Sequence, residues 1–412
     1  MTDEARSVVE LIARSSYGRL VALLASRAGD VAGAEDALGD AFLRALTRWP
    51  LDGVPENPDA WLVATAQRRL IDAGRHASVR ERAEPELAYA ATLLAAPDSA
   101  ATLPDRRLEL MFACGHPAID PTVRTPLMLQ VVLGLDAQVI ASAFLSAPSA
   151  MAQRLVRAKR KIRDAGIPFA IPEAEELEAR LDAVLEAIYA AFGTGWDALD
   201  GGDPERADLA GEAIFLGRLV THALPQAAES HGLLALMLYC HARTAARRAA
   251  DGAYIPLSAQ DASRWDHRMI GEAESALSVA ARLRHSGRFQ FEAAIQSAHV
   301  GRGFGHAVEP HAIVGLYDAL IAVAPTVGAL VSRAAAIGGA DGAEAGLAAA
   351  AALPEAAVES YQPWWALQAH LLQRLGRTDE AQVARVRAAG LTQDPAVRAF
   401  LLRDPGLPPS SR

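Results

Sequence analysis

The chain has 412 residues, of which 51% are hydrophobic and 22% are charged, and its formal net charge at pH 7 is −9. The high apolar content excludes a disordered or collagen-like chain, and the length predicts roughly two to four domains, each able to bury a core. Two cysteines cannot build a disulfide framework and favour a reducing cytosol. If this negative charge were spread evenly along the chain, it would argue against binding to nucleic acid.

Almost every segment shows apolar residues at helical spacing, and Pro and Gly clusters separate the segments, so we predict an all-α fold. Residues 6–49 are predicted to be helical, with a break at 27–30 and an end at Trp49-Pro50. A turn-rich stretch, 51–59, follows. Pro58 is then expected in the first turn of a helix over 58–77, where its missing N–H costs nothing.

Residues 79–104 have mixed charge and no clean period, so we predict a linker there. A compact segment over 105–166 ends at Gly166, with Pro168 just beyond, a pattern typical of a helix end. An acidic, alanine-rich part follows over 173–412. Residues 1–170 hold about 20 acidic and about 20 basic side chains, so the remainder carries essentially all of the negative charge.

Two further sequence patterns predict the cellular location of the protein. The first residues contain acids where a signal peptide needs basic residues. No stretch of about 18 apolar residues lacks charge. We therefore expect no signal peptide, no membrane span and a cytoplasmic location.

The densest basic run lies at 154–163, where six of ten residues are Arg or Lys and where both lysines of the chain, Lys159 and Lys161, are found. Such a run is either a solvated helix face or a helix that binds phosphates. Residues 136–165 favour the second interpretation, because a short apolar helix and a tight turn precede the basic helix. This arrangement predicts a helix-turn-helix whose second helix enters the major groove of DNA.

The second helix is predicted to pack through an apolar stripe, which consists of Met151, Leu155, Ala158 and Ile162. Its first-turn residues would lie against base edges, and its basic face would mainly contact phosphates. The predicted DNA-binding residues are Ser149, Ala150, Gln153, Arg154, Arg157, Arg160 and Lys161.

Several segments resemble a known family. QRLVRAKRKIR, preceded by LMLQVVLGLDAQVIASAFL and RRLELMFACGHPAI, resembles region 4 of extracytoplasmic-function sigma factors of bacterial RNA polymerase. AGAEDALGDAFLRALTRWP resembles the polymerase-binding helix of region 2, and NPDAWLVATAQRRLIDAGRH resembles the adjoining helix that recognises and opens the −10 element. Blocks such as LLALMLYCHAR and WALQAHLLQRLGRTDEAQVA resemble the helical-repeat extension of one subgroup, so the resemblance covers most of the chain.

The resemblance implies two further sets of binding residues. The surface for core polymerase would be formed by Glu35, Asp36, Asp40, Leu43 and Arg44, with Phe42 expected to pack inward. Opening of DNA needs an aromatic surface for unstacked bases and basic residues along the displaced strand. The candidate residues are Trp61, Thr65, Gln67, Arg68, Arg69, Asp72 and Arg75, and an ordinary core role is the alternative for Trp61.

This sequence departs from the family pattern near the predicted recognition helix. Ala147 and Pro148 stand where relatives usually have a capping Ser or Pro, Gln138 replaces a common acidic residue, and Gly115 stands where a second cysteine often follows Cys114. These changes leave the −35 sequence preference open.

Other candidate sites have weaker signals. Cys114-Gly-His116 lacks a second pair of ligands at zinc spacing, so we expect a buried structural cysteine. His299, His306, Glu309 and His311 cluster in the sequence, and a loop between helices is the expected interpretation. No catalytic constellation is found. We predict that the chain is not an enzyme and needs no metal or cofactor.

Residues 364–391 resemble a tetratricopeptide-type helix pair, in which Gly376 and Ala381 allow close packing. Tyr361, Trp364, Trp365 and Trp265 would pack in the core or, alternatively, line a groove. Because the extension is acidic, we expect its surface to contact basic surfaces. These could be regions 2 and 4 of the same chain or, alternatively, a basic surface of polymerase.

The sequence therefore predicts a sigma factor that binds core RNA polymerase and promoter DNA. Region 2 would span 6–78, region 4 would span 105–166, and the tetratricopeptide-like extension over 173–412 would regulate initiation. One alternative is a helix-turn-helix regulator with a repeat-type sensor domain that acts without polymerase. Another is a repeat scaffold whose basic helix is only a solvated face.

Overall fold

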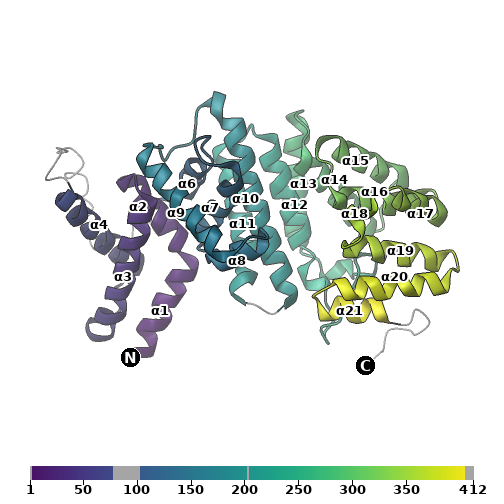
Figure 1. Ribbon diagram of the computed structural model, residues 1–412, viewed down its shortest axis with the longest axis horizontal. Coiled ribbons are helices and arrows are strands. Elements are labelled where there is room, and N and C mark those ends of the chain that lie inside the picture. Colours follow the sequence, from purple (N-terminus) through teal and green to yellow (C-terminus); the bar gives the residue numbers. More distant parts are fainter. Residues whose placement is uncertain (1, 78–102, 202–203, 404–412) are drawn as a thin grey trace. The chain divides into compact units, whose positions relative to one another are not determined.

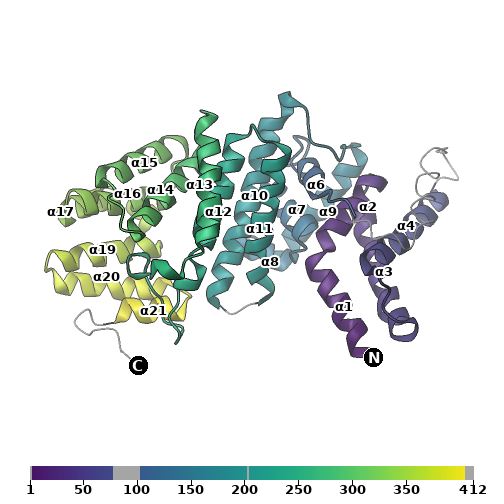
Figure 2. The same ribbon diagram turned by 180° about the vertical axis from the view of Figure 1, so that it is seen from behind.

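The computed structural model describes residues 2–77, 103–201 and 204–403, and the side chains of 2–3, 73–77, 197–201 and 204–208 lie outside this description. The described residues form helices and no strand, apart from one isolated bridge between Arg248 and Tyr254, as Figures 1 and 2 show. The prediction of an all-α fold is confirmed. The chain divides into two compact units, 1–191 and 192–412.

The first unit contains two groups of helices on either side of the undescribed residues 78–102. The first group is α1 (Thr2–Ser15), α2 (Tyr17–Ala28), α3 (Val31–Asp52) and α4 (Pro58–Ala77). The second group is α6 (Arg107–Cys114), α7 (Pro121–Leu133), α8 (Ala137–Ala143) and α9 (Pro148–Asp164), after which α10 (Ala174–Gly201) begins. The predicted linker over 79–104 lies almost entirely outside the described residues.

Helix boundaries in the first group agree with the sequence at two places and differ at two others, of which the first is an additional break at Ser16 between α1 and α2. Gly29 has a φ of 66° and ends α2, so the predicted break at 27–30 is present, and α4 has the predicted bounds. By contrast, α3 continues past Pro50 to Asp52. Pro50 lies in the last turn, where the Gly53 N–H still donates to the Trp49 carbonyl at 3.0 Å, so one missing donor does not end the helix.

Helix α2 is buried on all sides. Residues 20–25 are all 2% exposed or less, which requires neighbours around the whole circumference of the helix. These neighbours are α1, α3 and α4 from the first group and α6 and α7 from the second. The contact with α7 is so close that a Cβ atom on Gly18 would lie 1.7 Å from the carbonyl oxygen of Val132. The two groups of helices therefore share one hydrophobic core.

The second unit continues with helices that follow one another at short intervals. They are α11 (Pro204–Ala223), α12 (Ala228–His241), α13 (His267–Arg282), α14 (Arg288–Gly303), α15 (Pro310–Val323), α16 (Val327–Ala340), α17 (Ala343–Ala351), α18 (Glu355–Val358), α19 (Gln362–Arg374), α20 (Thr378–Leu391) and α21 (Pro395–Leu402). Most of them contact the next one or two along the chain. Such local contacts are typical of stacked helical repeats.

Small residues allow close packing in this unit. A Cβ atom on Gly346 in α17 would lie 2.6 Å from the Cα atom of Gly338 in α16. The helix pair that the sequence predicts over 364–391 is formed by α19 and α20. Gly376, with a φ of 73°, lies in the turn between them, and Ala381 is fully buried.

No single helix among those described is both long and apolar enough to cross a membrane.

We predict that Gly18→Ala destabilises the first unit by roughly 1–3 kcal/mol or more, because the added methyl group would overlap the Val132 carbonyl oxygen. Gly39→Ala is the matched control. Gly39 is an exposed glycine within α3 that has no neighbouring atom within 4 Å of a new Cβ, so this change should leave stability unchanged or raise it by about 0.5–1 kcal/mol. Thermal unfolding followed by circular dichroism measures both. Equal behaviour of the two variants would contradict the shared core.

Candidate nucleic-acid interface

Helices α8 and α9 are bent by 110° relative to each other across the four-residue turn 144–147. This angle lies within the roughly 90–120° that helix-turn-helix pairs adopt. The Asp136 carboxylate caps α8 by accepting the Gln138 N–H at 2.7 Å, whereas Ala147 provides no side-chain cap for α9. Pro148 starts α9 at a position where its missing N–H costs nothing.

The apolar stripe of α9 is buried, as its spacing predicts, and the opposite face points to solvent. The buried residues are Met151, Leu155, Ala158 and Ile162. The exposed residues are Ser149, Gln153, Arg154, Arg157, Arg160 and Lys161, and Ala150 is half-buried. The α9 residues that the sequence predicts to contact DNA therefore lie together along one accessible side, where they can contact a phosphate backbone.

One basic side chain of α9 faces the protein instead. Lys159 is 12% exposed, and its Nζ donates to Oε2 of Glu35 in α3 at 2.7 Å. One turn further along α9, Nη1 of Arg163 lies 3.8 Å from Oδ2 of Asp30. Sequence reasoning missed both pairs, because their members are more than 120 residues apart and no local pattern connects them.

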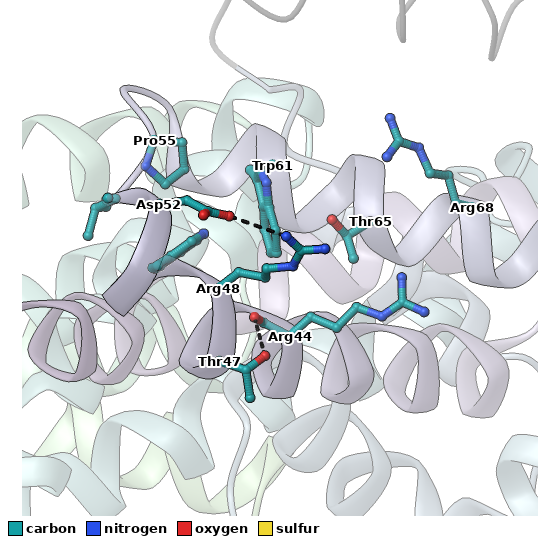
Figure 3. A pocket seen from close by; sticks show the side chains of 11 residues that line it. Arg44, Thr47, Arg48, Asp52, Pro55, Trp61, Thr65 and Arg68 are labelled. Carbon is teal, nitrogen blue, oxygen red and sulfur yellow. Dashed lines mark hydrogen bonds and ion pairs between the residues drawn. The ribbon is translucent and has the colours of Figure 1, made fainter. Parts of the chain in front are cut away.

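A cavity of about 620 Å³ lies between the end of α3, the following loop and the start of α4. Figure 3 shows its lining residues. They are Arg44, Thr47, Arg48, Trp49, Asp52, Gly53, Val54, Pro55, Trp61, Thr65 and Arg68. Trp61 is half-buried and meets Trp49 edge to face, with 5.4 Å between the ring centroids. Arg48 Nη1 lies 3.5 Å from Oδ2 of Asp52 at the rim.

The cavity combines an aromatic ring with several cations. Trp61 offers a surface on which a planar base can stack, and the arginines can contact the phosphates on either side of that base. Thr65 is buried and adds a hydroxyl to the same lining. These are the groups that a site for one unpaired nucleotide needs.

The structure brings some of the predicted melting residues together and places others elsewhere. Trp61, Thr65 and Arg68 line the cavity. Gln67 is buried, Arg69 forms an ion pair with Asp40, and Asp72 is exposed. The side chain of Arg75 lies outside the described residues. Arg48 and Trp49 also line the cavity, and the sequence analysis did not predict them. The spacing of Arg44 and Arg48, one helical turn apart, could have indicated that both lie on the same side of α3.

The residues predicted to bind polymerase fall into two groups. Asp36, Leu43 and Arg44 are exposed on α3, and Leu46 adds a further exposed apolar side chain one turn from Leu43. Phe42 is half-buried. Two acidic members, Glu35 and Asp40, are only partly exposed and are paired with Lys159 and Arg69.

A small polar cluster surrounds the Lys159–Glu35 pair. Burial raises the pKa of the Tyr17 hydroxyl, and the negative charge of Glu35 raises it further. Burial likewise raises the pKa of the Cys114 thiol, again with a contribution from Glu35. Both groups are therefore neutral at physiological pH.

The histidine cluster predicted to lie in a loop between helices lies there only in part, because His299 is in α14 and His311 is in the first turn of α15. Within the described residues, no group of three or more His, Cys, Asp or Glu side chains is placed to hold a metal ion. Burial and Arg243 lower the pKa of His299 to about 4. His311 lies between Glu309 and Asp341, at 3.2 and 2.9 Å from their carboxylates.

Three of the four aromatic residues expected to pack in the core, or alternatively to line a groove, make contacts within the protein. The indole N–H of Trp364 donates to the Ala350 carbonyl at 3.0 Å, and that of Trp365 donates to the Glu359 carbonyl at 2.8 Å. Trp265 is buried against Phe304.

Comparison with known proteins gives three findings. Residues 12–80 match the family described as sigma-70 region 2, and residues 180–281 match a family of unknown function (DUF6596). Over 377 residues the chain is 37% identical to uncharacterized protein R00370 of Rhizobium meliloti (strain 1021), which covers 89% of this chain and 88% of that protein. No solved structure matches.

We predict that the Cys114 thiol does not react with iodoacetamide at pH 8 in the folded protein and reacts fully in denaturant. Complete burial removes access, and the raised pKa removes the reactive thiolate. Mass spectrometry of digested samples measures the modification. Rapid labelling of the native protein would show that Cys114 is instead an accessible, functional thiol.

Proposed function

This chain belongs to the same family as the Rhizobium meliloti protein R00370 and carries a sigma-70 region 2 over residues 12–80, and we propose that it is an extracytoplasmic-function sigma factor with a helical-repeat extension. In this proposal the chain binds core RNA polymerase and directs initiation at specific promoters. Polymerase itself carries out phosphodiester synthesis, so this chain needs no catalytic residue.

The observation that carries the proposal is the cavity at the junction of α3 and α4. It lies inside the segment that matches sigma-70 region 2, and its volume is within the range of about 300–1,000 Å³ that is typical of small-molecule pockets. A base that leaves the duplex loses stacking on its neighbours. Stacking on Trp61 would replace that loss, while Arg44, Arg48 and Arg68 would hold the backbone of the displaced strand.

Helix α9 supports the second half of the proposal, recognition of the −35 element. Its exposed basic face would bind phosphates and so set the position of the helix on the duplex. Ser149 and Gln153, near the N-terminal end of α9, would then lie against base edges in the major groove. In this arrangement the segment 105–166 acts as region 4.

The exposed part of α3 supports binding to polymerase. Leu43 and Leu46 form an apolar strip that is suited to the centre of an interface, and Asp36 would steer it toward a basic partner surface. Region 2 in this proposal spans 6–78. The acidic, tetratricopeptide-like extension over 173–412 would regulate initiation through contacts with basic surfaces, either those of regions 2 and 4 or those of polymerase.

We expect Leu43→Asp to weaken binding to core polymerase at least tenfold, because a charge would be placed at the centre of the apolar strip. Leu11→Asp is the matched control, because Leu11 in α1 is exposed to the same extent, 63%, and lies outside the proposed surface. Purified chain is titrated with bacterial core polymerase, and transcript starts are mapped on a library of genomic fragments. If the unaltered chain binds no polymerase, the proposal is wrong, and a helix-turn-helix regulator that acts alone becomes the better interpretation.

We expect Trp61→Ala to weaken binding of the holoenzyme to promoter DNA with an unpaired −10 bubble by about 1–3 kcal/mol, or roughly 5- to 150-fold. Trp61→Phe should retain much of the affinity because a ring remains for stacking. Binding to the fully paired promoter should change less than binding to the bubble. An equal loss on both DNAs would indicate that Trp61 only supports the fold through Trp49.

A further inference from the structure

An aromatic and basic surface lies where α14 ends beside the start of α13, two helices that pack side by side (Figure 1). We call it the Phe304 patch, and its members, all of them exposed, are His267, Arg268, Arg302, Phe304 and His306. We propose that the Phe304 patch binds single-stranded nucleic acid through base stacking and phosphate contacts. The proposed function assigns the extension only contacts with basic surfaces, so this is an additional binding activity.

The Phe304 ring is exposed but held in place by other rings. Its centroid lies 5.6 Å from that of Trp265 and 5.2 Å from that of His267, and both pairs meet edge to face. Trp265 is buried, and a Cβ atom on Gly303 would lie 2.2 Å from its ring, so Trp265 also restrains the backbone next to Phe304. Because these contacts already order the ring, a base that stacks on it loses little side-chain entropy.

The arginines of the Phe304 patch have no acidic partner. Many arginines of the extension form ion pairs with acids, among them Arg218, Arg248, Arg288, Arg333, Arg377 and Arg387. Arg268 and Arg302, by contrast, form no ion pair with any described residue. Burial lowers the pKa of the nearby His299 to about 4, and the positive charges of Arg243 and Arg302 contribute, with no acid opposing them. The local potential is therefore positive within an acidic extension, which favours a phosphate.

The loop that carries Phe304 is open to a strand. Gly305 has a φ of 78°, and no atom lies within 4 Å of the place where its Cβ would be, so a ligand can approach the backbone closely. Two acids flank the patch in the sequence, but each is held at the start of a helix. Asp266 accepts the Met269 N–H at 2.9 Å, and Glu309 accepts the Ala312 N–H at 2.9 Å.

The rings favour an unpaired strand over other anions. Phe304 lies next to two further rings, with its centroid 5.2 Å from that of His267 and 6.4 Å from that of His306. Bases in a duplex stack on one another and offer no free face, whereas unpaired bases stack on Phe and His side chains. An acidic peptide would use the two arginines but has no need of the rings.

Photochemical cross-linking of the full chain tests the position of the site. The probe is a single strand of about 12 nucleotides that contains iodouracil, prepared once as DNA and once as RNA. Trypsin cleaves after Arg302, and the next basic cleavage site is Arg333, so Phe304 and His306 lie in the peptide 303–333. We expect this peptide to carry the cross-link, and the two probes show whether DNA or RNA is preferred. Absence of a cross-link there with both probes overturns the proposal, whether or not α4 and α9 are labelled.

Fluorescence anisotropy with the same strands tests the two kinds of contact. All chains also carry Trp61→Ala, so that the site predicted in region 2 does not contribute. Phe304→Leu keeps an apolar side chain against Trp265 but removes the ring, and we expect binding to weaken about fivefold or more. Arg302→Gln should weaken binding and reduce the slope of log affinity against log salt concentration by about 0.7.

Arg282→Gln is the matched control and should bind as the parent chain does. Arg282 is also exposed and also forms no ion pair with a described residue, but it lies at the other end of α13, roughly 22 Å along the helix from His267. Equal losses for Arg282→Gln and Arg302→Gln would overturn a specific site. A loss with Arg302→Gln but none with Phe304→Leu would overturn base stacking and indicate an acidic peptide as the partner.

Discussion

Burial of α2 on every side is the constraint on which the rest of the first unit depends. A helix with apolar residues around its whole circumference is stable in water only if neighbours cover it completely, and each fully buried leucine contributes about 1.5–3 kcal/mol. Leu20, Leu23 and Leu24 meet this condition by packing between helices that come before and after residues 78–102 in the chain. The position of α9 beside α3 follows from this arrangement, because α7, which packs on α2, also contacts α9.

At the edge of that core, the Lys159–Glu35 ion pair affects the relative orientation of α3 and α9 more than it affects the free energy of unfolding. A partly buried ion pair gains Coulomb energy but loses hydration, so its net contribution is small, whereas loss of one member leaves a costly unpaired charge. Lys159 and Glu35 are in this situation, and neutral Tyr17 and Cys114 beside them add no competing charge. Such a pair therefore favours one relative position of α3 and α9 while it contributes little net free energy.

Local patterns predicted much of this structure, and the remainder depends on contacts that are distant in the sequence. Periodicity and Pro58 located α4, and the spacing of Met151, Leu155 and Ile162 predicted the buried face of α9. Trp61, Thr65 and Arg68 are spaced by four and three residues, so their shared side of α4 was predictable. That Arg48 and Trp49 line the same cavity was not predictable, because it depends on the conformation of the loop after α3. Lys159–Glu35 joins residues 124 positions apart, and helical periodicity contains no such information.

The Lys159–Glu35 pair also changes what the net charge indicates about binding to DNA. A net charge of −9 suggests that the chain repels DNA. Counting the charged residues of the two halves separately suggests instead a near-neutral half with a basic helix, followed by an acidic half. The structure adds acids of the near-neutral half, Asp30 and Glu35, placed directly against the basic helix. A basic surface alone would satisfy Glu35 but leave Lys159 unpaired, and a phosphate alone would do the reverse. Because either partner alone would leave one member of the pair without its counter-ion, the pair favours the observed position of α9 against α3 unless both charges find new partners.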